Sequence, residues 1–183
     1  MSSCDHLRLM AAYNAAMNHK LYGAAARLPA SELMADRQAF FTSLFGTLNH
    51  VVAGDIVWLK RFAEHPADFP ALREMAQIAK PASLREWLVS DLESLLALRV
   101  RLDGIISAWA GQVQPADLQH LLRYQNSQGI QQKAFGALTA HFFNHQTHHR
   151  GQATTLLFQV GVDVGSTDLL DQIPNEPVGW VEP

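Results

Sequence analysis

Histidines are the residues of this chain best suited to chemistry, and they are unevenly distributed. The sequence has nine histidines, four of which fall between His141 and His149. His145 and His149 are four residues apart, so in a helix they lie one above the other on the same face. Two stacked imidazoles can share one divalent ion, and the absence of a glutamate between them excludes the zinc-protease pattern HExxH. This spacing predicts a metal site.

The two flanking histidines, His141 and His148, remain alternative ligands. Seven residues at alternating steps of three and four form one inward stripe: Phe135, Leu138, Phe142, His145, His149, Gln152 and Leu156. His148 lies off this stripe, rotated by about 100° from His149. The pairs His141/His145 and His145/His148 therefore stay open, although the stripe favours His145 and His149.

A third ligand must come from another helix, and His50 is the best candidate. Its neighbours one turn away are small, and they include Gly46 and Gly54. Each glycine inside a helix costs up to about 1 kcal/mol relative to alanine. Close approach of a second helix, or space for a ligand, would offset that cost. The remaining histidines are interpreted as surface or loop residues without a role: His6, His19, His65 and His120.

Four segments with helical periodicity position these side chains: 5–28, 32–62, 83–110 and 134–160. Ser83 and Glu86 form a capping box at the start of the third segment, and Gly161 ends the fourth. Four long periodic helices favour an all-α four-helix bundle, a fold that builds metal sites from inward-facing side chains. We expect a single domain over residues 1–183.

The connections between these helices are long. A short helical turn is expected around residues 71–78, and residues 121–133 could form a small hairpin before the last helix. The tail from about residue 162 is expected to be coil. Apolar residues outside the core stripes suggest a surface for a second copy of the chain: Tyr22, Leu28, Leu96 and Leu98.

Composition is ordinary for a globular protein, with 48% hydrophobic and 17% charged residues and a formal charge of −3. The absence of a basic run argues against nucleic acid or a membrane as partner, and no apolar run approaches a membrane span. The N-terminal sequence lacks the pattern of a secretory signal. The only cysteine, Cys4, is expected in a frayed terminus. These features predict a cytoplasmic protein.

The stretch 144–152, NHQTHHRGQ, closely resembles the NHxxHHRGQ signature of the DinB family. Leu48-Asn49-His50 with residues 55–59, and Tyr13-Asn14 with Asn18, resemble its second-helix and first-helix motifs. The resemblance covers nearly the whole chain. It implies a four-helix bundle, commonly a homodimer, with three histidine ligands for zinc, nickel or a similar ion. Those ligands correspond to His50, His145 and His149. Imidazole also suits iron and copper.

Related branches of that family include transferases and isomerases that use bacillithiol, mycothiol or glutathione. The resemblance is therefore compatible with a metal-dependent enzyme, such as a thiol-dependent S-transferase or a hydrolase. The alternative is a non-catalytic metal-binding protein that responds to stress. Asp55 could orient a ligand or pair with a surface cation, and Arg150 could hold an anionic substrate group or form an interhelix salt bridge. No catalytic residue is predicted, and the substrate stays open.

Overall fold

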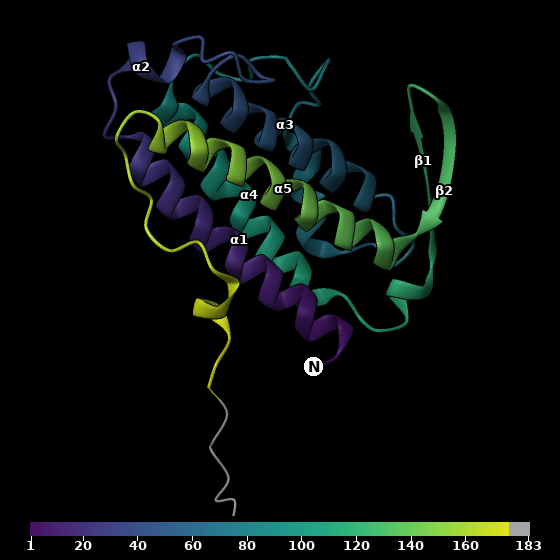
Figure 1. Cartoon of the computed structure of the whole chain (residues 1–183). Coiled ribbons are helices and arrows are strands. Elements are labelled where there is room, and N and C mark those ends of the chain that lie inside the picture. The colour runs from purple at the N-terminus through teal and green to yellow at the C-terminus, as the bar shows by residue number, and fades with distance from the viewer. Residues whose placement is uncertain (176–183) are drawn as a thin grey trace, which may run out of the picture.

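The computed structural model describes residues 1–175 and is mainly α-helical (Figure 1). The long helices are α1 (Ser3–Ala25), α3 (Leu44–Phe62), α4 (Leu92–Gln112) and α5 (Phe135–Phe158). The short elements are α2 (Ala30–Met34), the 3-10 helices η1 (Pro70–Gln77), η2 (Asp117–Gln119) and η3 (Leu169–Gln172), and the strands β1 (Leu121–Asn126) and β2 (Gly129–Ala134).

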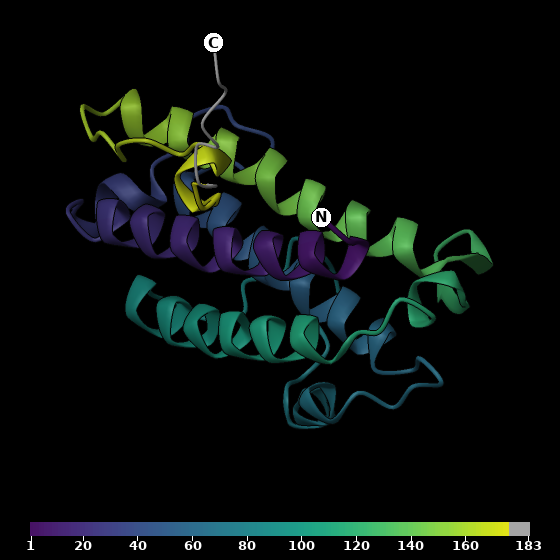
Figure 2. The same ribbon diagram turned by 90° about the horizontal axis from the view of Figure 1, so that it is seen from below.

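The four long helices pack along one another. α1 contacts α4 and α5, and α3 contacts the same two helices. Seen from below, α1 lies between α5 and α4 (Figure 2). Rings from three helices meet in the core at the C-terminal end of α3, where Phe62 packs against Trp109, Phe135 and Phe142 at centroid distances of 5.2, 5.3 and 5.6 Å. Burying each such side chain contributes roughly 1.5–3 kcal/mol.

The predicted second helix, 32–62, is wrong at its start because the helical conformation is interrupted after α2. Gln38 and Thr42 have positive φ angles of 55° and 70°, which a right-handed helix cannot contain. α3 then begins at Leu44, with the Ser43 side chain accepting a hydrogen bond from the Gly46 N–H at 3.0 Å. The intervening loop, residues 35–43, lies against the first turns of α3.

The predicted third helix, 83–110, also starts too early. α4 begins at Leu92, where the Asp91 side chain accepts from the Ser94 N–H at 2.8 Å. Residues 83–91 instead form turns and irregular backbone held by Asn49 of α3. The Asn49 side chain donates to the Glu86 carbonyl at 2.6 Å and accepts from the Leu88 N–H at 2.9 Å. These long-range bonds outweigh the local capping signal.

The hairpin and the helical turn at 71–78 are confirmed. β1 and β2 pair antiparallel from Leu121↔Ala134 to Asn126↔Gly129, and Gly129 has the positive φ of 106° that the turn requires. The fold is therefore mainly α rather than strictly all-α. From residue 162 to 175 the tail is irregular apart from η3, and the Tyr13 hydroxyl donates to the Thr167 carbonyl at 2.7 Å. The rest of the tail, 176–183, lies outside the described residues.

Two further predictions are corrected. Cys4 is buried in the first turn of α1, where Ser2 and Asp5 form a capping box, so this part of the N-terminus is not frayed. Tyr22 is buried in the core, and Leu28, Leu96 and Leu98 pack half-buried against it. Tyr22 is therefore inaccessible to a partner, and the other three residues are only partly exposed. Within residues 1–175, no helix has the length and apolar character needed to cross a membrane.

Candidate metal centre

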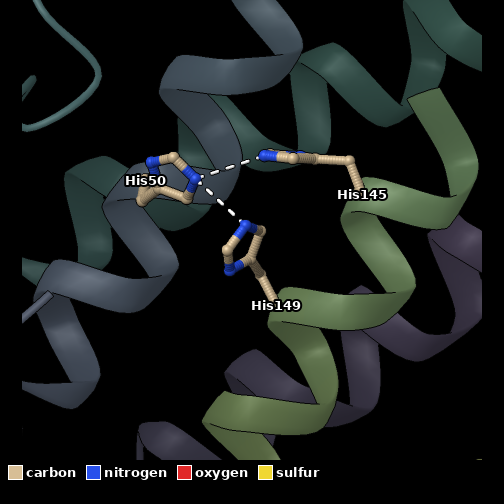
Figure 3. A group of neighbouring side chains, drawn as sticks. All are labelled: His50, His145 and His149. Carbon is tan, nitrogen blue, oxygen red and sulfur yellow. Dashed lines mark hydrogen bonds between the residues drawn. The ribbon is translucent and has the colours of Figure 1, made fainter. Parts of the chain in front are cut away.

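The histidines predicted as ligands, His50, His145 and His149, come together in the structure. His50 lies in the first half of α3, and the other two lie one turn apart on α5. Figure 3 shows the three rings pointing toward one another. The His50 Nε2 is 3.2 Å from the Nε2 of His145 and 3.2 Å from the Nε2 of His149. Each ring offers one nitrogen to a group whose atoms all lie within 4.8 Å.

The second nitrogen of His50 is fixed by backbone. Its Nδ1 lies 3.0 Å from the carbonyl oxygen of Leu84, which can only accept a hydrogen bond. The proton of the neutral ring therefore sits on Nδ1, and Nε2 carries a lone pair. Phe41, from the loop before α3, stacks on the His50 ring at a centroid distance of 3.8 Å. The ring is thus held by α3, by Leu84 and by Phe41.

His149 is fixed in the same tautomer by a side chain. Its Nδ1 lies 2.7 Å from the Gln152 Oε1, and the amide nitrogen of Gln152 lies 3.3 Å from the Nε2 of His148. This arrangement makes Nδ1 the donor and leaves a lone pair on the His149 Nε2. Outer hydrogen bonds of this kind orient the imidazoles of metal sites.

Two lone pairs that face each other at 3.2 Å repel unless a cation lies between them. A proton is a poor candidate. Burial, followed by the charge of neighbouring His149, lowers the pKa of His50 to about 4 against the raising effect of the Leu84 carbonyl. Burial and the neighbouring histidines lower the pKa of His145 to about 3. Burial also lowers the pKa of His149. At neutral pH all three rings are in the uncharged form that binds metals.

The spacing of the nitrogens fits a divalent ion. Two nitrogens bound at 2.0–2.1 Å to a tetrahedral ion lie about 3.3–3.4 Å apart. The observed separations of 3.2 Å are close to this value without any rearrangement of the backbone. The donor set is three neutral imidazoles, which suits several transition metals.

Comparison with known proteins agrees with the resemblance of the sequence to the DinB family. The sequence profile of the DinB family matches residues 1–178. The chain belongs to the DinB family. Protein DinB from Bacillus subtilis (strain 168) is 30% identical over 158 residues, which cover 85% of this chain and 87% of that protein. No solved structure matches the chain.

In this DinB-family chain, a buried polar network fixes α5 against α3. Asp55 of α3 forms an ion pair with Arg99 of α4 and accepts from the Gln146 amide of α5 at 2.8 Å. Arg99 also pairs with Asp103 at 2.9 Å. Gln146 follows His145 directly, so its bond to Asp55 sets the register of the ligand-bearing turn. Asp55 is neither a surface carboxylate nor hydrogen-bonded to the candidate ligand rings.

Arg150 does not form the interhelix salt bridge that was one of its two predicted roles. It is buried, and its guanidinium donates to the side chains of Asn14 on α1 and Thr147 on α5. The Tyr13 ring lies 5.3 Å from the guanidinium carbon. Arg150 therefore joins α5 to α1 through a neutral amide, rather than through a carboxylate, on a helix face away from the three imidazoles.

Gly46 and Gly54 of α3 allow other parts of the chain to approach the helix closely, which the sequence predicted from the cost of placing glycine inside a helix. A Cβ at Gly54 would lie 2.8 Å from the His145 Cε1, so only glycine leaves room for that ring. A Cβ at Gly46 would lie 2.2 Å from the carbonyl oxygen of Phe41, the residue that stacks on His50. Both glycines thus serve the histidine site.

The other histidines lie outside this group. His141 and His148 are exposed, and the His141 ring packs on Trp58 at 5.1 Å. His65 lies in the loop after α3, in agreement with its prediction as a surface or loop residue, but it is buried. Its ring stacks on His120 at 5.1 Å, and these two residues form a second possible metal-binding group with Asp117.

Proposed function

We propose that this DinB-family protein is a metal-dependent enzyme that holds one divalent transition ion on His50, His145 and His149. Zinc and nickel are the preferred ions, with iron and copper as alternatives. The observation that carries the proposal is the convergence of the three Nε2 atoms, two of them with their tautomer fixed by an outer acceptor. We further propose that the reaction is the transfer of a small cellular thiol to an electrophile.

An open coordination position distinguishes catalytic from structural sites. Three protein donors leave such a position, and His145 borders a surface hollow of about 370 Å³ through which a molecule can approach. A divalent ion at this position favours the thiolate over the thiol at neutral pH. The access supports an enzyme over the alternative of a non-catalytic, stress-responsive metal protein.

The chain's own residues orient the site, and its only thiol lies elsewhere. Leu84 and Gln152 keep two imidazoles in the binding tautomer, and the Phe41 ring shields one face of His50. The only cysteine, Cys4, is buried in α1. A thiol nucleophile would therefore enter from solution, and water is the alternative nucleophile. Water would make the protein a metal-dependent hydrolase, which is our second candidate.

The proposal extends to a single DinB-type four-helix-bundle domain that acts as a cytoplasmic homodimer. The packing of α1, α3, α4 and α5 supports the bundle. Family membership supports the dimer. Light scattering of the purified protein at micromolar concentration tests the dimer, and a mass near 20.3 kDa would contradict it.

Cobalt substitution tests the enzymatic proposal. Protein purified without a nickel column is depleted of metal, loaded with Co²⁺ and titrated with glutathione, cysteine and other small thiols. We expect a sulfur-to-cobalt charge-transfer band, thiol consumption when an electrophile is added, and neither effect in His145→Ala. If cobalt binds but no thiol produces the band or raises the melting temperature, thiol transfer is rejected. Ester and amide substrates then test hydrolysis.

A further inference from the structure

The hollow beside the metal centre has a charge that the three histidines do not explain. Its walls come from α3, from the segment before residue 84 and from the tip of the hairpin. They include Gly54, Trp58, Arg61, Lys80, Leu84 and His145. Arg61 and Lys80 are cationic, and none of the lining residues in the described part of the chain is acidic. A cationic hollow of this kind attracts anions.

Arg61 has unused hydrogen-bonding capacity. Its guanidinium carbon lies 4.6 Å from the Trp58 ring and 4.6 Å from the Tyr124 ring, so the group is held by two aromatic rings. Within residues 1–175 its one hydrogen bond, at 3.4 Å, goes to the Gln125 carbonyl. An arginine has five N–H donors. Between residues 1 and 175 no carboxylate lies within ion-pair distance of Arg61.

Five other arginines do not share this state. Arg8, Arg37, Arg73, Arg99 and Arg101 each pair with a carboxylate of the protein itself. Arg61 is ordered by aromatic rings instead, and its cation faces a space large enough for a ligand. Arg85 does lie against two aromatic rings and hydrogen-bonds the Phe40 carbonyl, but it does not line the hollow. A guanidinium in the position of Arg61 can bind a carboxylate in a two-pronged manner with little further loss of freedom.

One stripe of α3 connects Arg61 to the histidines. Gly54, Trp58 and Arg61 follow at steps of four and three, so they share a helix face. Gly54 is the residue on which His145 rests. Arg61 comes eleven residues after His50, about 16 Å along the helix axis. Because helical side chains lean toward the N-terminus, the long Arg61 side chain shortens the remaining gap to on the order of 10 Å.

We infer that this hollow binds a carboxylate group of a substrate whose other end reaches the metal centre, and that Arg61 is the specificity-determining residue. Lys80 adds charge at the exposed rim. What happens at the other end of the substrate rests on the proposed function, whereas carboxylate binding does not. The carboxylate belongs either to the small thiol or to its electrophilic partner, and these two sources share the same chemistry.

Calorimetric titration of the zinc-loaded protein tests the inference without any reaction. S-methylglutathione represents the thiol because it carries carboxylates but no free thiol, and benzoate represents an acidic electrophile. We expect one of the two to bind, and Arg61→Gln to weaken that binding roughly 10-fold or more, the size of a lost charge-assisted hydrogen bond. Arg61→Lys should retain part of the affinity because the charge remains. The diester of S-methylglutathione should not depend on Arg61.

Arg123→Gln is the matched control, because Arg123 is exposed on β1 and does not line the hollow. It should leave both affinities unchanged, and melting temperatures verify that the variants are folded. Arg61-dependent binding of S-methylglutathione assigns the carboxylate to the thiol, and of benzoate to the electrophile. If neither ligand binds the wild-type protein more tightly than Arg61→Gln, the inference is wrong. This outcome is independent of the cobalt band, which tests the thiol chemistry alone.

Discussion

The described part of the chain contains two groups of potential ligands, one formed by His50, His145 and His149 and the other by His65, Asp117 and His120. In each, the ligand atoms fall within 4.8 Å of one another. They differ in where the imidazole protons sit. In the first group, acceptors at Leu84 and Gln152 bind the Nδ1 protons of two rings, so their Nε2 atoms converge as lone pairs.

In the second group the key ring has the opposite tautomer. The His65 Nδ1 accepts a hydrogen bond from the Ala67 N–H at 3.1 Å, so the neutral ring carries its proton on Nε2. That nitrogen is buried, and within the described residues it has no hydrogen-bond partner. The ring itself packs among Phe69, Phe135 and His120. Binding an ion at Nε2 would require breaking the bond from Ala67.

The difference teaches that proximity of ligand atoms is not sufficient for a metal site. Hydrogen bonds on the far side of each ring decide whether a lone pair or a proton faces the common centre. On this criterion, the first group suits a metal ion and the second suits aromatic packing.

The largest expected effect separates the two groups directly. His50→Ala, His145→Ala and His149→Ala should each weaken metal binding on the order of 1,000-fold, well beyond the 10- to 100-fold cost of losing an outer partner. His120→Ala and His148→Ala should leave the affinity largely unchanged. Competition with a chelator of known affinity measures this. Equal losses in the His148 or His120 variants, with folding verified by circular dichroism, would show that the assignment is wrong.

The first group is also tied to the core through the ion pair between Asp55 and Arg99. Asp55→Ala leaves a buried guanidinium without this partner and should destabilise the protein by about 3–5 kcal/mol. Glu74→Ala removes the exposed pair with Arg101 and should cost no more than about 1 kcal/mol. Urea denaturation of the metal-free proteins measures both. Similar small losses in the two variants would contradict the anchoring role of Asp55.

Removing the outer acceptor of His149 sharpens the comparison further. Gln152→Leu keeps the three ligands but removes the Oε1 that holds the Nδ1 proton. We expect a 10- to 100-fold loss of metal affinity. His148→Ala, which removes the other contact of Gln152, is the control and should have little effect. An unchanged affinity in Gln152→Leu would mean that tautomer control does not distinguish the two groups.

The last effect concerns pH. Burial keeps the folded pKa of His50 near 4 and that of His145 near 3, below the unfolded value of about 6.5. Between these values the unfolded chain binds more protons, so the metal-free protein should be most stable above pH 6.5 and lose stability as pH falls through this range. Urea titrations at pH 8 and pH 5 measure the loss. The double variant His50→Gln/His145→Gln should lose less, and an identical loss would contradict this origin.

The sequence predicts the three candidate ligands because helical periodicity places His145 and His149 on one stripe and glycines mark the space around His50. Gln152 also lies on that stripe, so its contact with His149 could be predicted from the sequence. The contact of His50 with Leu84 could not be predicted, because any residue type offers the same backbone carbonyl. The helix predicted at 83–110 starts at Leu92 for a related reason. Long-range hydrogen bonds from Asn49 hold residues 86–88 in an irregular segment, and a local capping pattern contains no information about them.

The buried His65 of the second group shows another limit of prediction from the sequence. His65 lies just beyond α3, where a polar residue is expected in solvent. Its burial depends on Phe69 and Phe135, which approach it only in the folded chain. The environment of Arg61 could not be predicted for the same reason, because the Tyr124 ring that covers it comes from the hairpin. Contacts between elements distant in sequence determine which polar residues face a site.

X-ray absorption at the zinc edge, on protein loaded with one equivalent of Zn²⁺, tests the central claim most directly. We predict a shell with three imidazole nitrogens at about 2.0–2.1 Å and one further ligand, the oxygen of a water molecule. One imidazole should be lost in His145→Ala. A shell with fewer than three imidazoles, or one that stays unchanged in His145→Ala but changes in His120→Ala, would contradict it.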